Sequence, residues 1–195
     1  NSFKTGRLYL NTNQGQGTDE DFFNDTNPTD SVFTVKNNYE VNYNGENYLA
    51  LCWSEVPGFS KFGHYDGTGN NSTASNTVIE CGFKPAWVMI KSTTNTGEEW
   101  MMFDSARNPT NPANLFLKAE SSAAASSYQQ RRISFVDNGF KFDGANGQEP
   151  LNLSGRSYLF AAFGEHIPAP STFESAVVDE IDAADQSSGS NNASN

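Results

Sequence analysis

The chain has 195 residues, of which 13% are aromatic and only 18% are charged, and its formal net charge is −11. An acidic chain without a basic stripe argues against binding to nucleic-acid phosphates and to anionic membrane surfaces. No apolar run reaches the length of a membrane-spanning helix. The high content of Asn, Ser, Thr and Gly favours an all-β protein with many turns.

Strand candidates follow one another along the chain, and clusters of Gly, Asn, Pro or Ser separate them. We expect strands at residues 6–10, 31–35, 46–56, 76–83, 85–93, 98–106, 114–119, 132–142 and 157–167. The sequence Asp137-Asn138-Gly139 predicts a hairpin with a type I′ turn, because Asn-Gly accepts positive φ angles. Many short strands predict an antiparallel β-sandwich, jelly-roll or concanavalin-like in type.

Two segments of the chain resemble one another. YNGENYLALCWSE (43–55) aligns with LSGRSYLFAAFGE (153–165), with identities at Gly45, Tyr48, Leu49 and Glu55. Shorter likenesses occur upstream of both segments in the same order. The pattern predicts an internal repeat of about 110 residues that is truncated at the N-terminus.

The repeat suggests three parts. Residues 57–167 are interpreted as a complete β-sandwich unit, and residues 1–56 as the N-terminal half-unit of the repeat. A half-unit alone exposes strand edges and apolar surface, so we expect it to pack on the main sandwich. The alternative is that its partner strands belong to an upstream segment. Residues 168–195 are acidic and then Ser/Asn-rich, which predicts a linker or tail with room for one short helix.

The two cysteines, Cys52 and Cys81, both lie in apolar strand-like runs. There we expect a free thiol to be buried, where it behaves as a small hydrophobic side chain. A disulfide between them would close a loop of about 30 residues. Free thiols are the favoured interpretation, and the disulfide is the alternative.

Five motifs occur in a defined order: EVPGFSKFGHYDGTGN (55–70), CGFKPAWVMIK (81–91), EEWMMFDSARNP (98–109), DNGFKF (137–142) and YLFAAFGEH (158–166). In this order they resemble an uncharacterised domain family that recurs in tail-fibre and other virion structural proteins of tailed bacteriophages, notably marine ones. The resemblance covers residues 20–167 and implies a virion protein, but it supplies no catalytic residues. His64-Tyr65-Asp66 stands where that family more often has a small residue and Tyr, which implies a locally adapted loop tip.

The aromatic loop of the first motif has two interpretations. Aromatic faces stack on the apolar faces of sugar rings, so the loop is a candidate binding platform. The alternative is packing, in which Phe59 and Phe62 fasten the loop to the sheet. We assign packing to these two residues. His64, Tyr65 and Asp66 are expected to be exposed at the tip and are the candidate ligand-binding residues.

Other polar groups have plainer interpretations. Asp19, Glu20, Asp21 and Asp25 lack the ligand spacing of a calcium loop, so a solvated acidic loop is favoured over a metal site. Asp104 and Arg107 are expected to form an ion pair that braces a turn. We therefore expect no metal and no cofactor.

The sequence also argues against an enzyme. Its two histidines, His64 and His166, have no recognisable triad partners, and the paired-carboxylate pattern of concanavalin-like glycosidases is missing. We expect a non-enzymatic virion structural and adhesion module that presents loops to host surface glycans or proteins. We expect it to associate with copies of itself, for example as a homotrimer, and with other virion proteins. Its expected location is the virion, after synthesis in the host cytoplasm. The alternatives are an architectural spacer or capsid-decoration domain and, less favoured, a carbohydrate-active enzyme.

Overall fold

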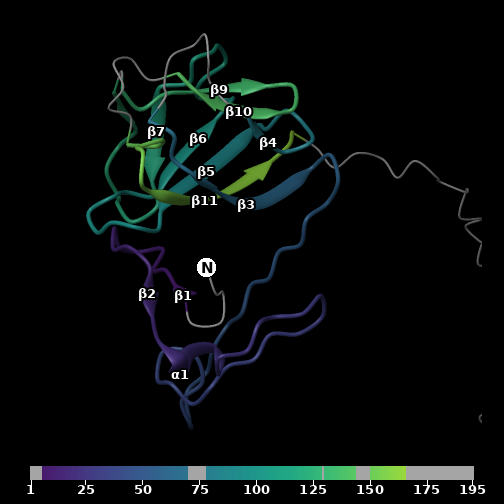
Figure 1. Ribbon diagram of the computed structural model, residues 1–195, viewed down its shortest axis with the longest axis vertical. Helices are drawn as coiled ribbons and strands as arrows, with labels where there is room; N and C mark the ends of the chain where they lie inside the picture. Colours follow the sequence, from purple (N-terminus) through teal and green to yellow (C-terminus); the bar gives the residue numbers. More distant parts are fainter. Residues whose placement is uncertain (1–5, 70–77, 129, 144–149, 166–195) are drawn as a thin grey trace, which may run out of the picture.

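The computed structural model describes residues 6–69, 78–128, 130–143 and 150–165 (Figure 1). This part of the chain is nearly all β, with antiparallel strand pairing throughout and one four-residue helix. The expected all-β class is confirmed at this level. No helix in the described ranges is long and apolar enough to span a bilayer. The predicted linker or tail at residues 168–195 lies outside the described residues.

The largest sheet has six strands in the order β3-β11-β5-β6-β7-β8. β11 occupies a central position, because it pairs with β3 on one side and with β5 on the other. The strands of this sheet are β3 (Ser60–Asp66), β5 (Trp87–Ser92), β6 (Met101–Asp104), β7 (Leu115–Lys118), β8 (Ser126–Ser127) and β11 (Ser157–Phe163).

A three-stranded sheet with the order β4-β10-β9 faces the large sheet, and a two-stranded ribbon lies near the N-terminus (Figure 1). The three-stranded sheet contains β4 (Ile79–Glu80), β9 (Ile133–Val136) and β10 (Gly139–Phe142). The ribbon pairs β1 (Gly6–Arg7) with β2 (Gly17–Thr18), and the helix α1 (Glu20–Phe23) follows it.

The main core lies between the two larger sheets. β11 alternates strictly, so that Tyr158, Phe160 and Ala162 are buried. Phe160 meets Phe140 of β10 edge-on, with the ring centroids 5.5 Å apart. Burying a large apolar side chain of this kind stabilises the fold by about 1.5–3 kcal/mol. The other buried apolar residues of this core are Tyr65, Cys81, Phe83, Val88, Ile90, Met101, Phe103, Ala113, Phe116, Ile133, Phe135, Phe142 and Leu151.

The predicted hairpin at Asp137-Asn138 is confirmed, because β9 and β10 pair with Val136 opposite Gly139. The predicted type I′ turn is wrong, since neither Asp137 nor Asn138 has a positive φ. The positive φ of 153° is at Gly139, which pairs with Glu80 of β4. A Cβ at Gly139 would overlap the carbonyl oxygen of Ile79. The close approach of β4, rather than the turn, therefore requires this glycine.

Two predicted strands are absent from the described residues. At 31–35 the chain makes a local turn, in which the Thr29 amide donates to the Val32 carbonyl at 2.8 Å. At 46–56 the backbone is extended, but its pairing is limited to an isolated bridge between Val56 and Ser60. The apolar pattern of the second segment is that of a strand, but the predicted strand is wrong, because the segment has no partner strand among the described residues. The shorter predicted strand at 6–10 is reduced to β1.

The N-terminal residues lie on the outer side of the six-stranded sheet, away from the small sheet (Figure 1). They are held to the sheet by residues 9–16: Trp100 Nε1 donates to the Tyr9 carbonyl at 2.9 Å, and the Gln16 amide donates to the Thr93 carbonyl at 2.8 Å. Residues 46–55 then return toward β3 as an extended segment. Every residue from 42 to 55 is exposed.

Candidate functional site

An apolar groove lies on the outer face of the six-stranded sheet. It consists of two adjoining hollows of about 290 and 470 Å³. Both are lined by His64, Trp100 and Leu159. We call this surface the outer groove. Its volume and apolar lining are those of a small-molecule site.

Strand alternation and register assemble the floor of the outer groove. Residues of β11 that do not face the core, such as Leu159 and Ala161, face outward and are half-buried. The register places Leu159 opposite His64 of β3 and Ala161 opposite Phe62 of β3. On the other side of β11, Ala161 lies opposite Met89 of β5. Because both faces of β11 carry apolar side chains, one face fills the core and the other forms the floor of the groove.

One end of the outer groove is polar. It is lined by Arg7 of β1, Gln16 just before β2, Thr93 just after β5 and Ser157, the first residue of β11. Arg7 forms an ion pair with Asp19 at 2.8 Å, and its guanidinium lies 4.4 Å from the ring centre of Phe22. Its Nε is buried and has no hydrogen-bond partner among the described residues. That nitrogen is not accessible from the groove, so the polar side chains that a ligand could reach at this end are those of Gln16 and His64.

The structure separates the three predicted ligand residues. They are the last residues of β3 rather than a loop tip, so the expected loop is wrong. His64 and Asp66 are exposed on the outer side, as expected. Tyr65 is only 8% exposed, which corrects the prediction for this residue. Strand alternation sends its ring into the core, where it stacks on Tyr158 with the ring centres 4.9 Å apart.

The packing role assigned to Phe59 and Phe62 is confirmed. Their rings meet the ring of Phe163 edge-on, at centroid distances of 5.9 and 5.6 Å. Phe62 also lines the outer groove. The same residue therefore contributes to packing and to the candidate binding surface.

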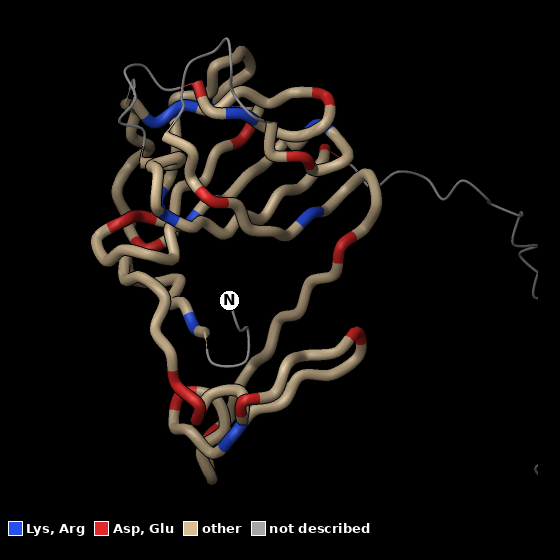
Figure 2. The backbone as a smooth tube through the Cα atoms, in the orientation of Figure 1, with Lys and Arg blue, Asp and Glu red and all other residues tan. Residues whose placement is uncertain are grey.

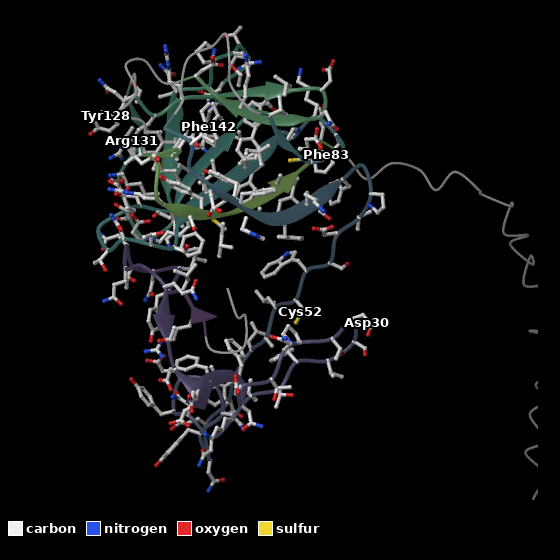
Figure 3. All side chains as sticks on the ribbon, in the orientation of Figure 1. Asp30, Cys52, Phe83, Tyr128, Arg131 and Phe142 are labelled. Carbon is white, nitrogen blue, oxygen red and sulfur yellow. The ribbon has the colours of Figure 1, made fainter. Side chains whose placement is uncertain are left out.

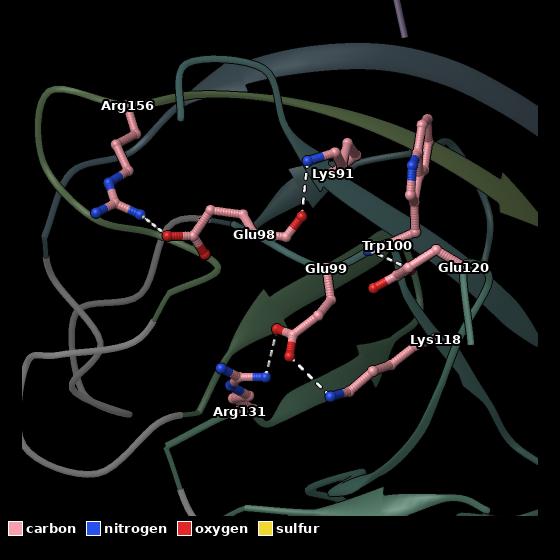
Figure 4. A network of polar contacts seen from close by, with 8 residues as sticks. All are labelled: Lys91, Glu98, Glu99, Trp100, Lys118, Glu120, Arg131 and Arg156. Atoms are coloured by element: carbon pink, nitrogen blue, oxygen red, sulfur yellow. Dashed lines mark hydrogen bonds and ion pairs between the residues drawn. The ribbon is translucent and has the colours of Figure 1, made fainter. Parts of the chain in front are cut away.

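Trp100, which the sequence did not single out, is held in place by main-chain and side-chain contacts (Figure 4). Its amide donates to Glu120 Oε2 at 3.1 Å, and its indole N–H donates to the Tyr9 carbonyl. Nearby, Lys91 is fully buried and donates to the carbonyl of Glu98 at 2.7 Å. Burial lowers the pKa of Lys91 below its usual value. These contacts fix the indole ring at the junction of the two hollows.

Two carboxylates anchor the loop between β5 and β6 that carries Trp100. Glu99 accepts hydrogen bonds from Lys118 and Arg131, each at 2.7 Å, and Glu98 pairs with Arg156 (Figure 4). Burial opposes the ionisation of Glu99, but the bonds from Lys118 and Arg131 outweigh it and lower the pKa of the carboxyl group. The groove wall that carries Trp100 is therefore preorganised.

The acidic residues near the N-terminus have structural partners. Asp19 caps α1 by accepting from the Asp21 amide at 2.9 Å, and Asp21 pairs with Lys36 at 2.6 Å. The predicted brace at the end of β6 is confirmed, because Arg107 Nε donates to Asp104 Oδ2 at 2.6 Å. Within the described ranges, no cluster of three or more potential metal-ligand side chains occurs.

The polar end of the groove does not have the order of a nucleophile–base–acid triad. Ser157 Oγ donates directly to Asp66 Oδ1 at 2.6 Å, so no histidine lies between the hydroxyl and the carboxylate. His64, on the same face of β3, is exposed beside this pair. The arrangement is suited to hydrogen bonding with a polar ligand.

Both cysteines are free thiols, which agrees with the favoured interpretation. Cys81 is buried, as expected, and burial raises the pKa of its thiol to about 11. Cys52 is exposed on the extended segment, outside the space between the sheets where Phe142 lies (Figure 3). The expected burial of Cys52 is therefore wrong, because the strand-like run around it has no partner strand.

Comparison with known proteins identifies one family. A family model described as a domain of unknown function (DUF7483) matches residues 1–167. The match covers most of the chain, so the protein belongs to this family. No curated protein and no solved structure shows significant similarity to the chain.

Proposed function

We propose that this chain, which belongs to the DUF7483 family, is a non-enzymatic structural and adhesion module of a virion. In this proposal it is part of a phage tail fibre, tail spike or other surface appendage. It binds glycans of the host surface in the outer groove. The mechanism is passive, because a rigid sheet presents a preformed binding surface.

The chemistry of the outer groove carries the proposal. Trp100 and Leu159 provide an apolar surface that matches the apolar face of a sugar ring. At the polar end, the side chains of Gln16 and His64 line the groove. Sugar hydroxyl groups can accept from such donors. Weak individual contacts would become useful when several copies bind together.

The virion assignment rests on the ordered motifs that resemble domains of phage tail fibres. The finer fold assignment is also part of this proposal: a jelly-roll or concanavalin-like sandwich. The two sheets that share one core support it. The proposed internal repeat is supported by the likeness of residues 43–55 and 153–165.

The test is binding of the multimerised chain to a glycan array. We compare the wild type with His64→Ala and Trp100→Ala, and with Tyr128→Ala as a matched aromatic control outside the groove. Binding that is lost in both groove variants but retained in Tyr128→Ala supports the proposal. Because Trp100 also contacts the N-terminal residues, each variant is first checked for an intact thermal unfolding transition.

Two other outcomes would change the assignment. Binding retained in both groove variants would place the ligand elsewhere on the chain. No binding by a folded, multimeric chain would favour an architectural role as a spacer or decoration domain. The exposed apolar side chains of residues 46–55 favour this second candidate, because they require a covering partner.

A further inference from the structure

The extended segment 46–55 is an unusual feature for a surface segment. Leu49, Leu51 and Trp53 are 83%, 65% and 66% exposed. Between residues 47 and 53 the backbone makes no hydrogen bond with another described residue. Its charged residues are confined to Glu46 and Glu55 at its ends (Figure 2). An apolar strand with open backbone groups is a template for pairing with another strand.

The composition of the segment is that of a central strand. The run Tyr-Leu-Ala-Leu-Cys-Trp is apolar on both sides, whereas a strand with one solvated face alternates apolar and polar residues. Its closest sequence counterpart within the chain is Tyr-Leu-Phe-Ala-Ala-Phe of β11. β11 is paired on both edges, and one of its neighbours is β3. A segment that resembles β11 therefore has the side chains needed to pair beside a strand such as β3.

Among the described residues, the edge of β3 that faces away from β11 pairs with no strand, apart from the isolated bridge between Val56 and Ser60 at its start. β3 is an edge strand of the six-stranded sheet and has seven residues. The Gly67 amide donates to the Arg156 carbonyl and the Gly164 amide donates to the Phe59 carbonyl, so the odd-numbered residues of β3 bond to β11. The backbone groups of Phe62 and His64 therefore point to the open edge. There the Phe62 amide donates to Glu55 Oε1 at 3.2 Å and the Ser60 amide donates to the Val56 carbonyl at 2.9 Å, so a strand from a second copy would replace the Glu55 contact.

Within one molecule, the segment is held away from this edge. At one end, Tyr48 Oη donates to the Tyr39 carbonyl at 2.6 Å and accepts from the Tyr43 amide at 3.0 Å. The N-terminal residues beyond are fixed to Thr93 and Trp100 on the far side of the groove. Folding the segment back along its own β3 would break these contacts. A second molecule can supply a donor strand for this edge without breaking them.

We propose that residues 46–55 of a second copy of this chain pair with the open edge of β3, and that the exchange is reciprocal. Two copies then form a closed dimer with two-fold symmetry. In this dimer each exposed segment gains a backbone ladder, and its apolar side chains extend the covered surface of the neighbouring sheet. This contact does not rest on glycan binding, because it uses the edge of β3 rather than Trp100.

Sedimentation analysis of the full chain over a range of concentrations tests the proposal. We expect a monomer–dimer equilibrium, and hydrogen exchange that is slower in the dimer at both 46–55 and 60–66. Leu51→Pro removes a backbone donor, and Leu51→Lys places a charge in the contact. We expect each to raise the dimer Kd about tenfold or more, which corresponds to about 1.4 kcal/mol.

The matched control is Leu10→Lys, at another exposed leucine in the N-terminal region. It should leave the dimer Kd unchanged. Because Leu51 is exposed, its variants should also keep the thermal transition of the monomer. A chain that stays monomeric at millimolar concentration overturns the proposal. So does a dimer that resists both Leu51 substitutions, or one that shows no added protection of β3.

Discussion

Replacing Tyr65 distinguishes a core residue from a ligand contact. Its ring stacks on Tyr158 at 4.9 Å and lies 5.3 Å from the ring of Phe142, and its hydroxyl donates to the Leu151 carbonyl at 2.7 Å. Replacing a buried aromatic residue with alanine costs about 3–5 kcal/mol, because the lost transfer free energy adds to the cost of the cavity. For a chain of this size the expected fall in Tm is about 6–20 °C.

Two further substitutions make the test specific. Tyr65→Phe keeps the ring but leaves the Leu151 carbonyl without its donor, which costs about 1–3 kcal/mol. His64→Ala removes the exposed neighbour on the opposite face of β3 and should change stability by no more than about 0.5 kcal/mol. Urea unfolding followed by tryptophan fluorescence measures all three. If Tyr65→Ala were as stable as His64→Ala, the placement of Tyr65 in the core would be refuted.

Three other predictions follow from burial and close packing. Ellman's reagent should titrate Cys52 in the folded chain and Cys81 only after unfolding, because only the first thiol is exposed. The pKa of the Cys81 thiol is raised to about 11 from an ordinary 9.0. The resulting contribution to the free energy of unfolding is complete below pH 9 and is lost as the pH rises through 11, a loss of up to about 3 kcal/mol. Cys81→Ala should remove this part of the pH dependence. Gly139→Ala should destabilise the chain by about 2 kcal/mol or more, since a Cβ overlaps β4 at a strained φ; equal urea midpoints for wild type and variant would contradict this reasoning.

The all-β class and most strands of the two main sheets were predictable from the sequence. Runs such as WVMIKS and SYLFAAF carry their own signal, because apolar side chains recur with period two or fill both faces. The run around Cys52 carries the same signal, yet it forms no strand in the single chain. Sequence pattern reports the capacity of a segment to pair, whereas the presence of a partner is a tertiary property.

The outer groove was predictable only in part. His64 was identified because it stands in an aromatic, glycine-rich stretch, but strand register decides that Tyr65 points inward. Trp100 lies more than thirty residues from His64 in sequence. The pairing of β3, β11, β5 and β6 brings them to one surface. No local pattern contains that information. The sequence did contain one sign of the groove. Both faces of β11 are apolar, whereas a strand with one face in water alternates apolar and polar residues.

The proposed groove and the proposed dimer contact share β3 without excluding one another. His64 has its side chain in the groove and its backbone at the open edge, so it is the residue where the two surfaces meet. Trp100 immediately precedes β6, which is separated from β3 by β11 and β5. A strand added to β3 would extend the groove wall while leaving Trp100 accessible. Dimerisation would then place two grooves on one rigid unit, which raises avidity for a multivalent surface ligand. On this reasoning, Leu51→Lys should weaken binding to a dense glycan surface while leaving the affinity for a soluble monovalent sugar unchanged.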